Sequence, residues 1–182
     1  MSQPARTEPA RADAERILRE RARALARPTH QPAPLEQIEL LEFRLARERY
    51  AVESRHVLEV CPFRDLTPLP GTPPFLLGLV NVRGRILPVM DLKKLFELPE
   101  QGVTDMHRVV LIRGNDLELG LLADVIVGVN SVARESLQPS LPTLTGIRAQ
   151  YLLGVTDEHL VVLDLDRILA DPRILIHDEV EN

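Results

Sequence analysis

The chain contains an internal repeat, and this repeat limits the folds that it can adopt. Three segments of the first half recur in the second half in the same order: Tyr50-Ala51-Val52 with Val57 and Val60 as Leu119-Gly120-Leu121 with Ile126 and Val129, Phe75-Leu76-Leu77-Gly78 as Tyr151-Leu152-Leu153-Gly154, and Asp91-Leu92 with Lys94-Leu95-Phe96 as Asp164-Leu165 with Arg167-Ile168-Leu169. A solenoid needs about three repeats to bury its faces. Two copies therefore predict a pair of similar β modules, with a groove where the modules meet.

The region from Gly78 to Leu92 has the pattern of a tight β-hairpin. Two β-rich apolar runs flank the pair Arg83-Gly84, and a glycine at such a corner adopts positive φ without steric cost. The runs are so continuously apolar that we expect both faces of each strand to be buried, and their apolar residues are Leu79, Val80, Val82, Ile86, Leu87, Val89 and Met90. Pro88 has no N–H to donate, which confines it to an edge or a bulge. The pattern therefore places the charged side chain of Arg83 at the hairpin turn.

Two aspartates precede short helical patterns. After Asp91, apolar residues at 92, 95 and 96 fit one helical face, so Asp91 is predicted to be an N-cap. Asp164 has the same place in the second copy. The pair Asp164 and Asp166 has residue types that acid–base catalysis uses, but a capping or dipole role is ordinary at a helix start.

Charge divides the chain into regions. Residues 1–30 hold seven Arg and four acidic side chains, which give this segment a net charge of +3. Because the whole chain has a net charge of −5, residues 31–182 carry −8. Residues 1–37 are predicted to form a basic helix and a Pro-rich linker; the helix could lie against the body, pair with a partner helix, or be solvated. The β domain is expected over 38–172, with module one at about 38–100, module two at about 107–169, and an acidic tail at 173–182.

Catalytic and metal-binding patterns are missing from the sequence. The five histidines, at 30, 56, 107, 159 and 177, lack the spacings of metal ligands on one element, and no phosphate-binding or nucleophile-elbow glycine motif occurs. The lone Cys61 lies in an apolar run and is interpreted as a small core residue. We expect no enzyme activity, no metal and no cofactor.

Two further function classes are disfavoured by composition. Barrels that bind nucleic acid track phosphates with a basic groove and stack bases on aromatic rings, whereas this body carries −8 and the chain has no Trp, 2 Tyr and 4 Phe. No stretch approaches the roughly 18 consecutive apolar residues of a membrane helix, and charges occupy the place of a signal peptide's apolar centre. The expectation is a cytoplasmic protein without direct membrane insertion.

The hairpin region strongly resembles the signature of the CheW family, the adaptors that couple chemoreceptors to the histidine kinase CheA. The resemblance extends from about Leu40 to Leu169, and its matching positions are Glu59, Asn81, Arg83, Gly84, Pro88, Asp91 and Leu92. Val82 stands where leucine is commonest in the family. The resemblance implies a mainly β fold of two SH3-like five-stranded barrel modules with short helices, and the predicted N-terminal helix lies outside this family core.

The same resemblance implies a function and a site. The chain would be an adaptor, associated with receptor arrays at the inner membrane, that binds the regulatory domain of a CheA-type kinase and the tip of a methyl-accepting chemoreceptor. Glu59, Asn81, Val82, Arg83 and Gly84 would contact partners, with Glu59 facing Arg83, and the structural motif residues would be Gly78, Pro88, Asp91, Leu92, Gly154 and Asp164. A protein-binding barrel scaffold in a non-motility pathway is the alternative. A nucleic-acid-binding barrel is a weaker one.

Overall fold

The computed structural model describes residues 36–99, 107–114, 116–139 and 146–174 of the chain. The helix predicted within the first 30 residues and the Pro-rich linker lie outside these ranges. So do residues 140–145 of a second Pro-rich loop, expected at 138–145, and residues 175–182 of the acidic tail. Within them, no helix is long and apolar enough to cross a membrane.

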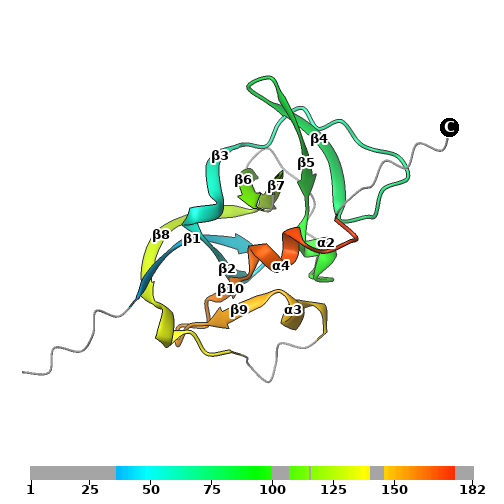
Figure 1. The fold of residues 1–182 in the computed structure, drawn as a ribbon. Helices are drawn as coiled ribbons and strands as arrows, with labels where there is room; N and C mark the ends of the chain where they lie inside the picture. Colours follow the sequence, from blue (N-terminus) through cyan, green and yellow to red (C-terminus); the bar gives the residue numbers. More distant parts are fainter. Residues whose placement is uncertain (1–35, 100–106, 115, 140–145, 175–182) are drawn as a thin grey trace, which may run out of the picture. The chain divides into compact units, whose positions relative to one another are not determined.

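The described residues form ten strands joined by short helices (Figure 1). The first half contains β1 (Gln37–Leu45), β2 (Glu48–Glu53), η1 (Ser54–His56), β3 (Val57–Pro62), β4 (Leu76–Val82), β5 (Arg85–Met90) and α2 (Leu92–Leu95). The second half contains β6 (Arg108–Gly114), β7 (Leu117–Ala123), β8 (Val125–Ala133), η2 (Arg134–Ser136), α3 (Ile147–Gln150), β9 (Leu152–Val155), β10 (Val161–Leu163) and α4 (Leu165–Leu169). This element order confirms the prediction of a mainly β fold with short helices.

The strands form two five-stranded sheets that exchange hairpins between the halves of the chain. The first sheet has the order β8-β1-β2-β10-β9, and the second has the order β3-β6-β7-β5-β4. Each opening hairpin, β1–β2 or β6–β7, therefore pairs with the last three strands of the other half. The antiparallel pairs β1–β8 and β3–β6 and the parallel pairs β2–β10 and β5–β7 make this connection. Each sheet thus combines strands from both halves of the chain, so the modules expected at about 38–100 and about 107–169 do not each form a sheet of their own. Sequence similarity identifies equivalent strands, but it does not specify which copy each strand pairs with.

Each sheet is closed by an equivalent backbone bridge between one edge strand and the segment that follows the other edge strand. Thr67, after β3, exchanges two backbone hydrogen bonds of 2.8 Å with Leu79 of β4. Gln138, after β8, exchanges bonds of 2.9 and 2.8 Å with Val155 of β9. These bridges satisfy backbone groups at both edges, so each sheet curls toward a small barrel.

The repeated glycines stand at these closing points. A Cβ atom on Gly78 would lie 2.2 Å from the carbonyl oxygen of Thr67, and one on Gly154 would lie 2.7 Å from Cβ of Leu137. Gly78 also has a φ of +146°, which side chains rarely permit. The recurrence of Gly78 as Gly154 therefore reflects the same close approach in both sheets.

The two aspartates cap their helices as predicted. Oδ1 of Asp91 accepts a 2.9 Å hydrogen bond from the backbone N–H of Lys93, and Oδ1 of Asp164 accepts one of 3.1 Å from Arg167. The capped helices bury their apolar sides in one core that draws on both sheets, and their buried residues include Leu92, Leu95, Leu165, Ile168 and Leu169. Each half thus completes its core only with strands of the other half.

Asp124 links the two sheets. It is the single residue between β7 and β8, which belong to different sheets. Its Oδ1 lies 2.5 Å from Nζ of Lys93 and 2.8 Å from Nε2 of His107, while Oδ2 accepts a 2.6 Å bond from the backbone N–H of Ala46. Burial raises the pKa of Asp124, but the hydrogen bonds from Lys93 and Ala46 outweigh burial and lower it. One carboxylate therefore joins groups from both sheets.

Candidate partner-binding site

The predicted hairpin turn is present between β4 and β5, and the hairpin projects at the top of Figure 1. Arg83 has a φ of 53° and Gly84 a φ of 85°, and the paired residues Val82 and Arg85 flank them. Two successive positive φ angles are what a type I′ turn requires. Oδ1 of Asn81 accepts a 2.8 Å hydrogen bond from the N–H of Gly84. Asn81 thus supports a turn in which Arg83, a residue type that rarely adopts positive φ, projects its side chain outward.

Glu59 and Arg83 form the ion pair that the family resemblance implies. Nη2 of Arg83 lies 2.8 Å from Oε2 of Glu59. The Arg83 side chain is 81% exposed, whereas that of Glu59 is 21% exposed. Because β3 and β4 are the two edges of their sheet, this side-chain pair spans the same opening that the backbone bridge closes. An exposed pair adds only about 0–1 kcal/mol to stability, so its main effect is to orient Arg83.

Three further charged residues extend the Glu59–Arg83 ion pair into a network across the second sheet. Nη1 of Arg85 donates to Oε2 of Glu118 at 2.6 Å, and its Nη2 lies 3.9 Å from Oε1 of Glu59. Nε of Arg113 donates to Oε1 of Glu118 at 2.7 Å. Arg85, Arg113 and Glu118 are not among the site residues predicted from the sequence. The only available signal was the Gly114–Leu117 hairpin, whose register places Arg113 opposite Glu118.

The hairpin strands are less buried than expected near the turn. Val80, Leu87, Val89 and Met90 are buried as predicted, whereas Leu79 and Val82 are half-buried and Ile86 is 67% exposed. The prediction for Ile86 is wrong because β5 pairs with β7 only from Val89 onward, so the outer part of the hairpin has no covering strand. Pro88 lies in this outer part, where β5 pairs with β4 alone and is locally an edge.

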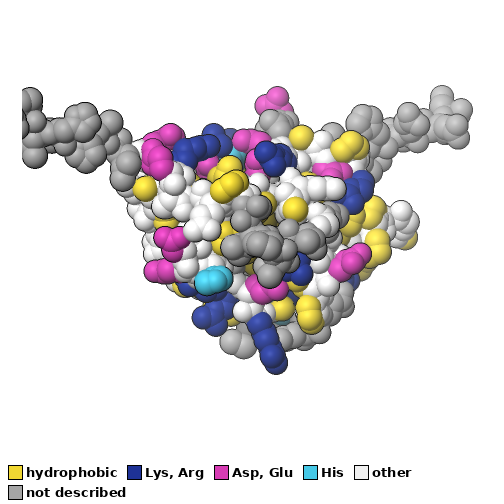
Figure 2. All heavy atoms as spheres, turned by 90° about the horizontal axis from the view of Figure 1, so that it is seen from below, with side chains coloured by type: hydrophobic (Ala, Val, Ile, Leu, Met, Phe, Trp, Pro, Cys, Tyr) yellow, Lys and Arg dark blue, Asp and Glu magenta, His cyan; other side chains and the backbone are white. Residues whose placement is uncertain are grey.

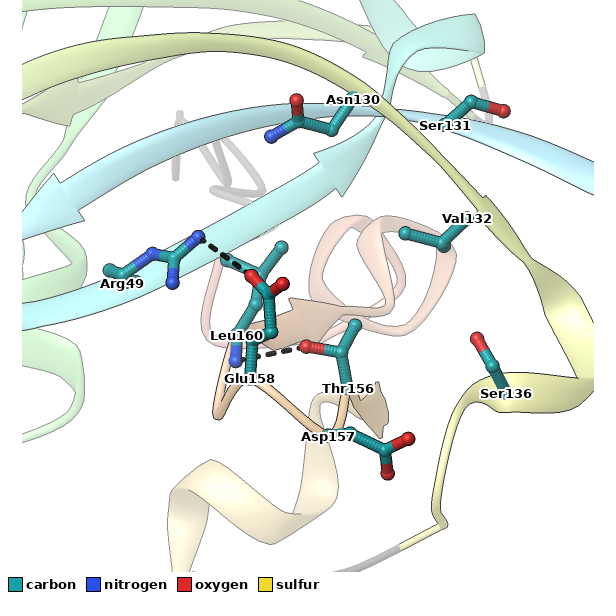
Figure 3. A pocket seen from close by; sticks show the side chains of 9 residues that line it. All are labelled: Arg49, Asn130, Ser131, Val132, Ser136, Thr156, Asp157, Glu158 and Leu160. Carbon is teal, nitrogen blue, oxygen red and sulfur yellow. Dashed lines mark hydrogen bonds and ion pairs between the residues drawn. The ribbon is translucent and has the colours of Figure 1, made fainter.

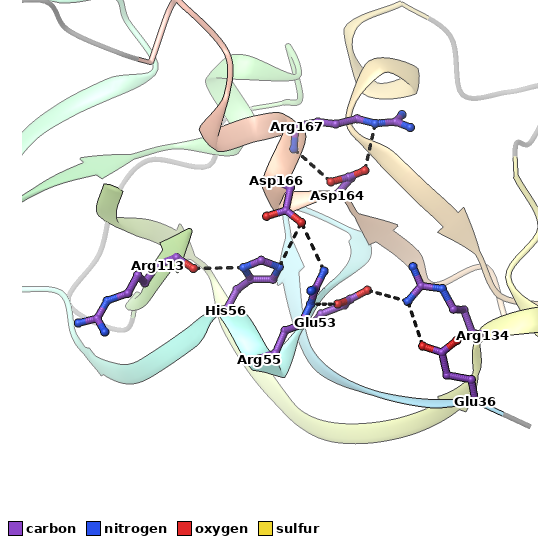
Figure 4. A network of polar contacts seen from close by, with 9 residues as sticks. All are labelled: Glu36, Glu53, Arg55, His56, Arg113, Arg134, Asp164, Asp166 and Arg167. Carbon is purple, nitrogen blue, oxygen red and sulfur yellow. Dashed lines mark hydrogen bonds and ion pairs between the residues drawn. The ribbon is translucent and has the colours of Figure 1, made fainter. Parts of the chain in front are cut away.

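A second polar network lies around η1 (Figure 4). Glu53, which is nearly buried, pairs with Arg55 and lies 3.5 Å from Nη1 of Arg134. Nδ1 of His56 lies 3.1 Å from the carbonyl oxygen of Arg113, and its Nε2 lies 3.8 Å from Asp166. These contacts tie α4 and the first sheet to β6 of the second sheet. They lie beside a cavity of about 100 Å³ and have a structural role in joining the sheets.

A larger cavity of about 410 Å³ opens on the first sheet between β2, β8 and the β9–β10 turn (Figure 3). Arg49 projects into it and is fixed from behind by Glu42, which accepts bonds of 2.6 Å from Nε and 3.1 Å from Nη2. The Arg49 hydrogen bond lowers the pKa of Glu42 despite the opposing effect of burial, and Asn130 adds a further bond of 2.9 Å. Glu158 lies 3.8 Å from Arg49 at the rim. The lining is mixed in charge and specifies no single ligand.

The paired barrels and the supported hairpin define the class of protein. The fold matches the crystal structure of the scaffolding protein TtCheW from Thermoanaerobacter tengcongensis with a TM-score of 0.67 and 28% sequence identity, covering 79% of this chain and 94% of that one. The chain therefore shares the fold of this scaffolding protein.

The family model for the CheW-like domain matches residues 39–173, and the chain belongs to this family. Its relatives include the chemotaxis protein CheW of Treponema pallidum, which is 31% identical over 146 residues, 76% of this chain and 86% of the relative. Protein FrzA of Myxococcus xanthus is 32% identical over 137 residues, 72% of this chain and 84% of the relative.

Proposed function

We propose that this chain is a non-enzymatic adaptor that couples a chemoreceptor to a CheA-type histidine kinase. The observation that carries the proposal is the outward guanidinium of Arg83, which a positive-φ turn, Asn81 and Glu59 hold in one place. Membership of the CheW-like family and similarity to named chemotaxis proteins support it. The adaptor would act in the cytoplasm, at receptor arrays that it reaches through its partners.

The hairpin tip is the proposed contact for the receptor. Ile86 lies opposite Asn81 in the β4–β5 pairing, and it exposes an apolar side chain beside the Arg83 turn. A guanidinium makes several directed hydrogen bonds, and an adjacent apolar side chain gains when a partner removes it from water. Asn81, Arg83 and Ile86 together supply both kinds of contact, with Val82 and Gly84 shaping the turn.

The kinase is proposed to cover the exposed apolar residues of the edge strands β3 and β8. On β3, Leu58 is 38% and Val60 39% exposed, and on β8, Val125, Val127 and Val129 are 52%, 48% and 60% exposed. Exposed apolar residues that alternate along an edge strand favour association with another protein, because a partner that covers their side chains removes them from water. Assigning this surface to the kinase regulatory domain rests on the family resemblance.

A protein-binding scaffold in a non-motility pathway would use the same surfaces with different partners. A nucleic-acid-binding barrel is disfavoured because residues after 30 carry a net charge of −8. On the face shown in Figure 2, acidic and basic side chains are interspersed, which is not the pattern of a phosphate-binding groove.

Binding measurements with purified partners test the proposal. The chain should bind both the regulatory domain of a CheA-type kinase and a chemoreceptor tip fragment from the same cell. Leu58→Asp should reduce kinase binding and spare receptor binding, and Arg83→Ala should do the reverse. A chain that binds neither partner, or that binds DNA tightly in high salt, would overturn the proposal.

A further inference from the structure

The five charged residues around the hairpin are layered. The side chains of Arg83, Arg85 and Arg113 are 81%, 43% and 57% exposed, whereas those of Glu59 and Glu118 are 21% and 22% exposed. The two carboxylates therefore lie beneath, and the three guanidinium groups lie above them. This part of the second sheet presents positive charge to solvent, although the residues after 30 carry a net charge of −8.

The glutamates fix the arginines while leaving hydrogen-bonding capacity on their outer sides. Arg113 engages Glu118 through Nε and Nη2, and Arg83 engages Glu59 through Nη2. Both arginine side chains are more than half exposed, at 81% for Arg83 and 57% for Arg113, so each presents part of its guanidinium group to solvent. A guanidinium that is already oriented loses less conformational entropy when it binds a second carboxylate.

We propose that Arg85 and Arg113 extend the Arg83 contact into one cationic surface that binds an acidic segment of the receptor, with Glu59 and Glu118 as positioning residues beneath it. The inference rests on the proposed function, which makes the hairpin the receptor contact, and it adds the chemistry of the partner segment. Opposite charges across such an interface would also steer association against the repulsion expected from the acidic body.

Glu118 has a specific part in this arrangement. It accepts a hydrogen bond from Nη1 of Arg85, and Nη2 of the same guanidinium lies 3.9 Å from Oε1 of Glu59. If Glu118 did not hold Arg85, that guanidinium would be free to approach Glu59 and compete with Arg83, which is now 2.8 Å away. Glu118 thus keeps the two arginines at separate positions.

The test measures binding of the full-length chain to a chemoreceptor tip fragment by calorimetry at several salt concentrations. Arg85→Gln and Arg113→Gln should each weaken binding by about three- to tenfold and flatten its salt dependence. Arg47→Gln serves as the control, because Arg47 is an exposed arginine in the β1–β2 turn of the other sheet. A tip fragment with its Asp and Glu residues changed to Asn and Gln should bind less tightly and discriminate less between the wild-type chain and these variants.

Glu118→Gln separates positioning from charge alone. This change makes the surface more positive, so a pure charge effect predicts tighter binding, whereas loss of positioning predicts weaker binding. We expect weaker binding with an unchanged melting temperature. Tighter binding would refute the positioning role of Glu118.

The remaining outcomes distinguish a failure of the cationic surface from a failure of the proposed function. If the wild-type chain binds the fragment but the Arg85 and Arg113 variants bind equally well, the cationic surface is wrong and the proposed function stands. If the wild-type chain does not bind the fragment, the proposed function itself fails. If single-stranded DNA binds at the same arginines more tightly than the fragment does, the partner class is wrong.

Discussion

Asp124 and Ala46 are 78 residues apart in the chain, yet Oδ2 of Asp124 accepts a 2.6 Å hydrogen bond from the backbone N–H of Ala46. Ala46 lies in the β1–β2 turn of the first sheet, and Asp124 ends the connection from the second sheet. The other oxygen of the carboxylate is held by Lys93, whose side chain is 2% exposed. The pairing of this carboxylate with a buried ammonium is therefore one of the contacts that join the two sheets.

Asp124→Asn should destabilise the fold strongly. The change leaves the buried ammonium of Lys93 without its counter-ion, and breaking a buried pair from one side costs about 3–5 kcal/mol. Urea denaturation should report this loss in the free energy of unfolding. The double variant Asp124→Asn with Lys93→Met should recover part of it, because the uncompensated charge is gone. Additive losses would mean that the two residues act independently.

Gly78→Ala should destabilise the second sheet. Its Cβ would meet the carbonyl oxygen of Thr67 at 2.2 Å, and backbone atoms cannot give way as a flexible side chain can. We expect a loss of more than about 1 kcal/mol in thermal or chemical unfolding. Gly71→Ala is the matched control, because Gly71 also has a positive φ but a Cβ atom added there would have no atom within 4 Å. Equal losses at both sites would leave backbone strain, not the close approach, as the cause.

The helix caps and the turn glycine were predictable from the sequence because neighbouring residues determine them. The caps at Asp91 and Asp164 and the positive φ at Gly84 depend on a few adjacent residues. The exchange of hairpins between sheets depends instead on contacts such as that of Tyr50 with Val161, which no local pattern encodes. The exposure of Ile86 follows from that strand order, which ends the β5–β7 pairing early.

The exchange itself predicts how fragments behave. Residues 36–103 and 104–174 each contain one complete copy of the repeat, but each half lacks the hairpin that completes its own three-strand group. Each fragment alone should therefore give a circular dichroism spectrum of a largely unfolded chain, and mixing the two should restore the β signal. Independent cooperative unfolding of either fragment would contradict the exchanged pairing.

Glu42 should contribute a pH-dependent part of the stability. Its pKa is lowered in the fold, mainly by the hydrogen bond from Arg49, so the folded state binds fewer protons at Glu42 than the unfolded state does. The stabilisation is present above the unfolded pKa and is lost as pH falls through the folded one. The difference in unfolding free energy between wild type and Glu42→Gln should therefore shrink progressively as pH falls below the ordinary glutamate pKa. Glu158→Gln, at a side chain that is 81% exposed, should show little such dependence.

Arg83→Ala should separate function from stability. Because the Arg83 side chain is 81% exposed, its loss should leave the far-UV spectrum and the melting temperature nearly unchanged. Receptor binding should weaken by about 1–4 kcal/mol if Arg83 is an interface hot spot. If the variant unfolds instead, Arg83 is required for the stability of the fold. If neither stability nor receptor binding changes, the turn is not a contact.

Glu59→Ala and the double variant with Arg83→Ala complete a double-mutant cycle. Since Glu59 orients Arg83, the two losses in binding should be non-additive. Additive losses would show that Glu59 contacts the receptor on its own account.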